Sequence, residues 1–339
     1  MSKKLFAAVL TSATLWIGGA SALVAAETRT LELLNVSYDP TRELWRDINQ
    51  HFIPVYAKEG GVTLAIKQSH GGSSTQARAV IDGLEADVVT IASAIDTDAI
   101  AQRGLITGDW QRRLPNDSLP YTSTIIFVVR KGNPKAIKDW RDLVRPDVSV
   151  ITPNPKTSGN GYLSFFCAWG SVVLRGGSKQ DAIDFVTKLY KNVPVLDSGA
   201  RGATTTFVQR GIGDVHLAWE NEAHLEVREA KGDLDLIYPE ISIRAEPHVA
   251  VVDANVDRRK TRAAAEAYLK YLYTDEAQEI VAKHFYRPSS EAILKKHAAT
   301  FPSLRLFSIK EIAPSFADAH RQFIGDGGVF DSIYKPKGR

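Results

Sequence analysis

Three short patches rich in glycine and hydroxyl residues are the parts of the chain whose composition suggests chemistry. They are QSHGGSS at Gln68–Ser74, NPKTSGNG at Asn154–Gly161 and DSGARG at Asp197–Gly202. Each follows a run with strand character, and such loops leave backbone N–H groups free at the first turn of a helix. Proteins use groups of this kind to hold anions. Three patches in one chain predict a site that surrounds a small tetrahedral anion.

The patch NPKTSGNG is the most specific of the three. Ser158 has a hydroxyl to donate, and the Gly-Asn-Gly that follows leaves N–H groups free at a predicted helix start. A nucleotide-binding Walker loop carries Lys-Ser/Thr after its last glycine, whereas Lys156 and Thr157 come before it here. The pattern therefore does not indicate nucleotide binding. Taken alone, it fits a plain capped turn equally well.

The other two patches each contain a side chain with more than one interpretation. His70 is either a base or ligand, or a packed or capping residue, while Ser73 lies at a predicted helix start. Arg201 is either a direct anion ligand or a supporting ion-pair residue, with Asp39 as a candidate partner. The sequence pattern alone leaves both alternatives open.

The sequence contains no pattern typical of a metal centre or a catalytic nucleophile. His216, Glu220 and His224 are regularly spaced, but the first lies in a predicted strand, so the three do not share one helix face. The single cysteine, Cys167, lies in an apolar run and is expected to be a buried, inert thiol. We therefore expect neither enzymatic activity, nor a cofactor, nor a bound metal ion.

The net charge argues against nucleic acid as a partner. The 339 residues carry a formal charge of +3, and Lys3 and Lys4 supply two of those charges. Without its N-terminal segment the chain is nearly neutral, which is not typical of proteins that bind nucleic acid or an anionic membrane surface. Local geometry, rather than net charge, must then hold an anion.

Residues 1–26 have the features of a secretory signal peptide. A positively charged start is followed by an apolar stretch and by the small residues Val24-Ala25-Ala26 before Glu27. Ala20–Ala22 is a second candidate cleavage site, and a retained membrane anchor is the alternative interpretation. We predict cleavage and a location in the periplasm.

The order of predicted elements indicates an α/β fold with two lobes. Strand, glycine- and serine-rich loop and helix repeat in two runs, at about 27–112 and 114–219, which predicts mostly parallel sheets covered by helices. In such sheets ligands bind at the carboxyl ends of the strands, where all three patches lie. We expect strands at 30–36, 62–68, 87–91, 122–130, 148–152, 193–196 and 215–219, and helices at 41–56, 74–84, 161–174, 181–190, 204–210, 261–273, 275–284 and 309–323.

Taken together, these residues resemble the periplasmic sulfate-binding proteins of ABC transporters, and almost as closely the related thiosulfate-binding proteins. The resemblance covers nearly the whole chain after residue 26. Besides the three patches it rests on LLNVSYDPTRELW at Leu33–Trp45, EADVVT at Glu85–Thr90, TSTIIFVVRKGNPK at Thr122–Lys135 and VLDSGARGATTTFVQRGIGDVHLAWENE at Val195–Glu222.

The resemblance implies a type II periplasmic-binding-protein fold with the ligand between the lobes. Its first lobe would comprise residues 27–112, its second lobe 113–220, and residues 221–339 would return to the first lobe with C-terminal helices. The expected function is capture of sulfate and its delivery to the membrane permease of an ABC importer, by a monomer that binds no nucleic acid. The alternatives are thiosulfate as the ligand, and an exported enzyme acting on sulfate or phosphate esters.

The resemblance also assigns roles to individual residues. It implies that backbone N–H groups, a serine hydroxyl and an indole N–H hold the anion, with no charged side chain in contact. The implied ligand-binding residues are Ser73, Ser158, Gly159, Asn160, Ala200 and Trp219, and the implied supporting residues are Asp39, Arg201 and His70.

Two positions separate sulfate from thiosulfate as the expected ligand, and one departs from the family pattern. Asn160 matches the thiosulfate-binding proteins, whereas Trp219 favours sulfate because those relatives carry another aromatic residue there. We expect sulfate. Tyr162 stands where the family pattern has an arginine, so a supporting charge is missing beside the second patch.

Overall fold

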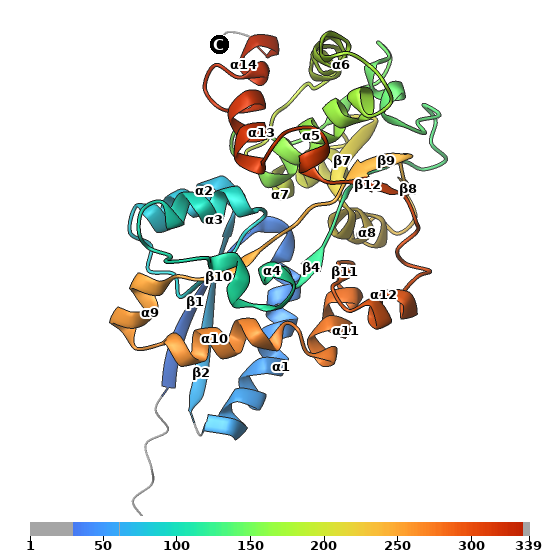
Figure 1. Cartoon of the computed structure of the whole chain (residues 1–339). Coiled ribbons are helices and arrows are strands. Elements are labelled where there is room, and N and C mark those ends of the chain that lie inside the picture. Colours follow the sequence, from blue (N-terminus) through green and yellow to red (C-terminus); the bar gives the residue numbers. More distant parts are fainter. Residues whose placement is uncertain (1–29, 61, 335–339) are drawn as a thin grey trace, which may run out of the picture.

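The protein has two lobes, each built on a four-stranded sheet (Figure 1). The computed structural model describes residues 30–60 and 62–334, and the predicted signal peptide at 1–26 lies outside them. The first sheet has the order β10 (Val249–Val251), β3 (Val88–Thr90), β1 (Thr30–Tyr38), β2 (Thr63–Gly71). The second has the order β6 (Val150–Ile151), β7 (Val215–Trp219), β5 (Ile125–Arg130), β8 (Leu234–Ile237).

In each sheet one strand runs opposite to the others. In the first sheet β1, β2 and β3 are parallel, as predicted, and β10 is antiparallel to β3. In the second sheet β6 and β7 are parallel, but β5 is antiparallel to both β7 and β8, so this sheet is mixed rather than mostly parallel. Both opposing strands follow a crossing between lobes. A chain that arrives from the other lobe enters at the junction and runs away from it, whereas the strands that precede the patches run toward it.

Helices cover both faces of the first sheet. On one face lie α1 (Arg42–Gly60), α10 (Arg262–Tyr271) and α11 (Asp275–Lys283), and on the other lie α2 (Ser73–Ile81) and α3 (Ala94–Ala101). The helical spacing predicted at 41–56 is confirmed for Leu44, Trp45, Ile48 and Phe52, which are buried against the sheet, whereas Val55, expected on the same face, is only half-buried. Each such side chain contributes about 1.5–3 kcal/mol on burial. The short α9 (Asp253–Arg259) and α12 (Glu291–Lys296) complete this region.

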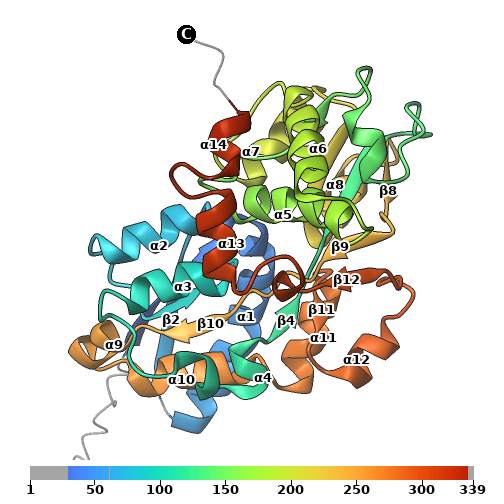
Figure 2. The same cartoon turned by 45° about the horizontal axis from the view of Figure 1, so that its top comes forward.

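The second lobe carries the largest hydrophobic core. The apolar α5 (Gly159–Val173) is buried along most of its length. The C-terminal helices α13 (Phe316–Phe323) and α14 (Val329–Ile333) lie beside it (Figure 2) and share its core. Trp169 and Phe323 join α5 to α13, with ring centroids 4.6 Å apart. The remaining helices of this lobe are α6 (Lys179–Lys191), α7 (Ala200–Thr204), which continues as a π-helical turn over Thr205–Gln209, and α8 (Glu220–Glu229).

Two predicted elements are wrong in detail. Residues 193–196 form no strand, because Pro194 lacks an N–H to donate and the neighbouring Asn192 supplies the contact to β6 through its carbonyl, which accepts from Val150 N–H at 2.9 Å. The helix predicted at 309–323 is interrupted by Pro314. Ser315 caps the helix α13 that follows, accepting a hydrogen bond from the Asp318 backbone N–H.

The chain crosses between the lobes more often than the expected segments 27–112, 113–220 and 221–339 imply. Helix α8 and strand β8 stay with the second sheet, so the return to the first sheet occurs at β10 rather than at residue 221. After α12 the chain leaves the first lobe again, since β12 (Arg305–Phe307) pairs in parallel with β9 (Ile241–Ile243). The segments near residues 120, 245 and 303 therefore all connect the lobes (Figure 1).

A buried ion pair fixes one of these connections. Arg287, in β11 (Arg287–Pro288), donates to both oxygens of Glu220, at 2.7 and 2.8 Å. Glu220 is fully buried and directly follows the last residue of β7. The pair thus anchors the end of β7 to the segment that leaves the first lobe.

Replacing Arg287 is expected to cost much more stability than replacing a cation in an exposed pair. Arg287→Met leaves the Glu220 carboxylate buried and unpaired, which should lower the free energy of unfolding by about 3–5 kcal/mol in urea denaturation. The control is Lys131→Met, which breaks the solvent-exposed pair with Asp235 and should leave stability nearly unchanged. Equal losses in the two variants would contradict this account.

Candidate functional site

The three patches meet where the two lobes touch. Gly72 follows β2 in the first lobe, and a methyl group built on it would lie 2.3 Å from the backbone oxygen of Thr157 in the second lobe. A methyl group on Gly159 would lie 2.5 Å from the Ala92 side chain, in the first lobe. The second and third patches are joined by the Thr157 hydroxyl, which donates to the Ser198 carbonyl at 2.8 Å. The loops that were predicted to share one site therefore do lie together.

Each patch ends in a helix whose first turn has no side-chain cap. Helices α2, α5 and α7 begin after Gly72, Ser158 and Gly199, and none of these three residues caps its helix through a side chain. The first N–H groups of a helix have no partner within it, and they carry the positive end of the helix dipole. The residues that bear these groups, Ser73, Gly159, Asn160 and Ala200, are all buried.

Two buried side-chain donors complete this group of N–H donors. The indole Nε1 of Trp219 and the amide Nδ2 of Asn160 have no hydrogen-bond partner in the described part of the chain. Trp219 is the last residue of β7, and its ring packs against Tyr38 of the first lobe with centroids 5.3 Å apart. An unsatisfied buried donor costs about 1–3 kcal/mol. Two of them beside three uncapped helices suit a ligand that is entirely a hydrogen-bond acceptor.

The two serines predicted to bind the ligand differ in their surroundings. The Ser73 hydroxyl is committed within the protein: it donates to the carboxylate of Asp96 and accepts from the Ala92 backbone N–H at 3.0 Å. Its backbone N–H, in the first turn of α2, remains available. Ser158 precedes α5 without capping it, so its hydroxyl is not used by its own helix.

The cationic side chains around the patches are neutralised within the protein. Arg201 lies 3.2 Å from Glu43 of the first lobe and 3.1 Å from Glu222 of the second. Its suggested pairing with Asp39 is wrong, because Asp39 pairs instead with Arg42 at 2.6 Å. This arrangement supports Arg201 as a residue that joins the lobes rather than one that holds a ligand.

His70 is a half-buried, neutral histidine. Burial, helped by the positive charges of Arg42 and Arg201, lowers its pKa to about 4. Its Nε2 has no partner among the described residues, while its carbonyl accepts from Arg42 at 3.3 Å. At neutral pH His70 therefore adds no charge to the site.

The residues considered as metal ligands take separate partners. His216 contacts Glu226 at 3.1 Å, Glu220 pairs with Arg287, and His224 contacts Tyr238 at 3.0 Å. Across residues 30–60 and 62–334 no group of three or more potential ligands could hold a metal ion. Over the same residues no helix has the length and apolar character needed to cross a membrane.

Cys167 is buried in α5, as the sequence suggested. Burial raises the pKa of its thiol to about 12. Its sulfur accepts from the Ile243 backbone N–H at 3.3 Å. Cys167 therefore packs as a structural residue on the inner face of the second lobe.

Two residues near the site were missed by sequence reasoning. Tyr38 supplies the aromatic surface under Trp219, and Asp96 binds the Ser73 hydroxyl from α3. Nothing in their local sequence marks either of them. Tyr162, which was singled out as a departure from the family pattern, leads to Asp96, because its hydroxyl donates to that carboxylate at 3.2 Å and contacts Ser93 at 2.8 Å.

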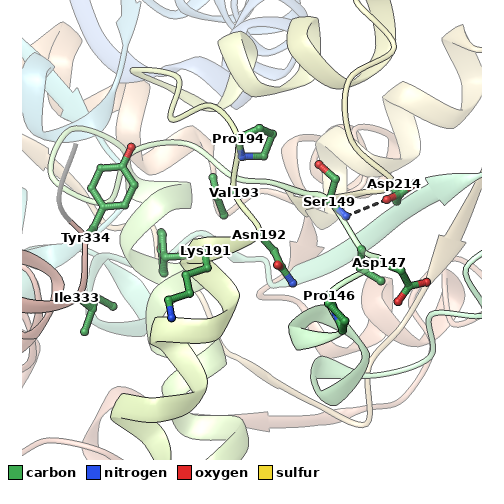
Figure 3. Close-up of a pocket in the computed structure, with 12 residues that line it drawn as sticks. Pro146, Asp147, Ser149, Lys191, Asn192, Val193, Pro194, Asp214, Ile333 and Tyr334 are labelled. Carbon is green, nitrogen blue, oxygen red and sulfur yellow. Dashed lines mark hydrogen bonds between the residues drawn. The ribbon is translucent and has the colours of Figure 1, made fainter. Parts of the chain in front are cut away.

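A separate surface cavity lies far along the second lobe and contains none of the patches. It has a volume of about 850 Å³ and lies where the chain enters β6, beside the ends of α6 and α14 (Figure 3). One side of it is closed by the Ser149 backbone N–H, which donates to Asp214 at 2.8 Å. Its lining offers no group of free donors comparable to that at the lobe junction.

Several carboxylates lie near the single positive charge of Arg201, so we expect the free energy of unfolding to depend on pH. Burial, together with Glu226, Glu43 and Asp39, raises the pKa of Glu222 to about 8 even though Arg201 opposes the shift. The folded protein therefore holds a proton that an unfolded glutamate, with a pKa of about 4.5, releases. Stability should fall as the pH rises between these two values.

Glu222→Gln should remove part of this pH dependence, because an amide does not titrate. Between about pH 5 and pH 8 the wild type should lose at least about 1 kcal/mol more stability than the variant, as measured by urea denaturation. Glu240→Gln, at an exposed glutamate, is the control and should retain the wild-type profile. Parallel profiles for Glu222→Gln and the wild type would show that Glu222 is ionised throughout.

Known binding proteins are similar to this chain over nearly its whole length. Residues 45–287 match the family of bacterial extracellular solute-binding proteins. A sulfate-binding protein of Salmonella typhimurium is 53% identical, over 94% of this chain and 99% of its own length. A thiosulfate-binding protein of Pseudomonas aeruginosa is 50% identical, over 98% of this chain and 99% of its own. Both relatives are described as binding proteins and not as enzymes.

Solved structures show the same two-lobed architecture. The sulfate-binding protein SubI from Mycobacterium tuberculosis has a TM-score of 0.79 at 31% identity, over 87% of this chain and 99% of that chain. A periplasmic thiamin-binding protein, at 16% identity and a TM-score of 0.66, shares the fold alone. The two-lobed α/β fold and the full-length similarity establish that this chain belongs to the family of bacterial extracellular solute-binding proteins.

Proposed function

We propose that the protein captures sulfate between its lobes and delivers it to the membrane permease of an ABC importer. The observation that carries this proposal is the meeting of three uncapped helix N-termini with the unpartnered indole of Trp219. The proposed contacts are the N–H groups of Ser73, Gly159, Asn160 and Ala200, the hydroxyl of Ser158 and the indole N–H of Trp219.

A site made of donors suits an anion that carries no proton. Sulfate is fully ionised at neutral pH and presents only acceptor oxygens, whereas hydrogen phosphate also brings a proton that needs an acceptor. Hydrogen bonds to a charged group contribute about 1.5–3 kcal/mol each, and a helix N-terminus adds about 0.3–1 kcal/mol. About six such bonds can offset the dehydration of a dianion and leave micromolar affinity.

Thiosulfate is the second candidate, since the Pseudomonas aeruginosa relative is a thiosulfate-binding protein of 50% identity. The two ligands differ at one position, where thiosulfate has a sulfur in place of an oxygen. A sulfur atom is a weaker acceptor than an oxygen, so a ring of strong N–H and O–H donors favours sulfate. The indole of Trp219 supports the same choice.

Calorimetric titration with sulfate, thiosulfate, molybdate and phosphate tests the proposal directly. Sulfate should bind most tightly, with one site per chain, and phosphate should compete poorly. Preference for thiosulfate would replace the ligand while keeping the site. Absence of binding for all four anions would reject the proposed function.

The indole of Trp219 should account for a measurable part of the affinity. Trp219→Phe removes the Nε1 donor and keeps an aromatic ring against Tyr38, so sulfate affinity should fall by about 1.5–3 kcal/mol, or roughly tenfold to a hundredfold. The matched control is Trp169→Phe, in α5, whose ring packs against Phe323 away from the patches and whose affinity should be unchanged. Equal affinities for all three proteins would remove Trp219 from the contacts.

The close approach at Gly72 should be required for the lobes to close on the ligand. Gly72→Ala places a methyl group 2.3 Å from the Thr157 backbone oxygen, which forces the two lobes apart. We expect sulfate to reduce the radius of gyration of the wild type in X-ray scattering, but not that of Gly72→Ala, and affinity to fall by at least about tenfold.

The control for Gly72→Ala is Gly60→Ala, because a methyl group on Gly60 meets no atom within 4 Å. It should close on sulfate as the wild type does. If Gly72→Ala closes on sulfate as far as the wild type does, a methyl group at this contact does not hold the lobes apart.

The location and partners follow from the same proposal. Capture of a nutrient anion outside the cytoplasm requires export, which the predicted signal peptide at 1–26 supplies, and a permease that accepts the loaded protein. We expect the protein in the periplasmic fraction, as a monomer, and without nucleic acid. Light scattering of the purified protein measures the mass that distinguishes a monomer from a dimer.

A further inference from the structure

A buried carboxylate lies directly behind one of the proposed ligand-binding residues. Asp96, in the first turn of α3, accepts a hydrogen bond from the Ser73 hydroxyl and another from the Tyr162 hydroxyl at 3.2 Å. Ser93 contacts Tyr162 at 2.8 Å and completes a chain of hydroxyl groups. No lysine or arginine side chain forms a salt bridge with Asp96 in the described part of the chain.

The Ser73 hydroxyl has one proton to donate, and it uses that proton in its hydrogen bond to the ionised form of Asp96. Because the Ser73 oxygen also accepts from the Ala92 N–H at 3.0 Å, the hydroxyl then presents only a lone pair to any other neighbour. A lone pair repels an anion. If Asp96 carries a proton, it becomes the donor to Ser73, and the Ser73 proton is free to point toward the anion. The protonation of Asp96 therefore decides whether Ser73 is a donor or an acceptor at the site.

The groups that face Asp96 are hydroxyls and one histidine. Ser73 and Ser74 face it from α2, Ser93 from the start of its own helix, Tyr162 from α5 and His320 from α13. Burial raises the pKa of Asp96, although the three hydroxyls of Ser73, Ser74 and Tyr162, and His320, oppose the shift. Burial also lowers the pKa of His320, which favours its neutral form.

Asp96 has a route to solvent that does not pass through the ligand. It lines a cavity of about 660 Å³ whose other lining residues come mainly from α2, α3 and α13. These three helices lie next to one another in Figure 2. Arg78, Arg103 and Lys156 also line this cavity, and Lys156 is paired with Asp326 and Asp331. The cavity therefore reaches Asp96 from a side that none of the proposed ligand-contact residues lines.

We propose that Asp96 is a positioning residue that takes up one proton from solvent when the anion binds, so that Ser73 turns its hydroxyl toward the anion. A hydronium ion or a buffer acid gives up the proton: its own bond to hydrogen breaks, water or the conjugate base is released, and the O–H bond forms on Asp96. A dianion placed next to Ser73 disfavours a second negative charge on Asp96, so the bound state holds the proton more tightly than the free state. The inference rests on the proposed function, because it requires an anion at this site.

Linkage fixes the sign of the effect. Since the bound state has the higher pKa, affinity should fall as the pH rises between the free and bound values, by at most about tenfold per pH unit for one proton. The experiment is calorimetric titration of sulfate in buffers of different ionisation enthalpy, from about pH 5 to about pH 8. The measured heat of binding should depend on the ionisation enthalpy of the buffer, in the sense expected for proton uptake. The number of protons taken up per bound sulfate should lie between zero and one.

Asp96→Asn distinguishes this role from a purely structural one. The asparagine amide can donate to Ser73 as a protonated carboxyl does, so the variant should bind sulfate without proton uptake and with an affinity independent of pH. At the alkaline end it should bind more tightly than the wild type. A variant that keeps the wild-type proton uptake overturns the proposal.

Two further variants keep the test decisive. His320→Gln should retain the proton uptake, and its loss there would assign the proton to His320 instead. Tyr162→Phe removes a hydrogen bond that stabilises the ionised carboxylate of Asp96, so the pH range over which the affinity falls should move to higher pH. This variant also tests the proposal if Asp96→Asn does not fold. Sulfate binding with no buffer dependence at any pH refutes the proton linkage alone, whereas absence of binding at every pH refutes the proposed function.

Discussion

The site depends on one steric constraint, the close approach of backbone turns from two lobes. The N-terminal groups of α2, α5 and α7 can face one small volume only if no side chain stands between them. Gly72 and Gly159 meet this requirement, because a methyl group on either would lie within 2.5 Å of an atom of the opposite lobe. The order of each sheet serves the same end, since the strands before the patches end at the junction.

Charge is handled by removing it from the site rather than by concentrating it there. Arg201 is balanced by Glu43 and donates a hydrogen bond to Glu222, Lys156 is balanced by Asp326 and Asp331, and His70 is kept neutral by burial. What remains at the junction are dipoles, neutral donors with fixed positions, and the Nε–H of Arg201, which has no partner among the described residues. Such groups stabilise a buried anion without a counter-charge that would itself need dehydration. They also discriminate by hydrogen-bond direction, which a free cation does not.

Tyr162 stands where the resemblance led us to expect an arginine, and its hydroxyl donates to Asp96. A phenol in place of a cation leaves the Asp96 carboxylate to hydroxyl partners alone, at 3.2 Å from Tyr162 and in contact with Ser73. A buried carboxylate held this way responds to a nearby dianion through its proton rather than through an ion pair. The anion site and the cavity lined by Asp96 are then linked through a single side chain.

The sequence by itself determined the patches, the strand–loop–helix order and about half of the strands and helices, because glycine, hydroxyl residues and hydrophobic periodicity act locally. Through resemblance it predicted Ser158 and Trp219 as ligand-binding residues, and it marked Tyr162 as an exception without a role. Only the tertiary structure decided that Arg201 pairs with Glu43 and Glu222 rather than Asp39, that α8 and β8 stay in the second lobe, and that Asp96 lies behind Ser73. Those facts join residues more than 20 positions apart, up to 158 for Arg201 and Glu43, and local pattern carries no information about such pairings.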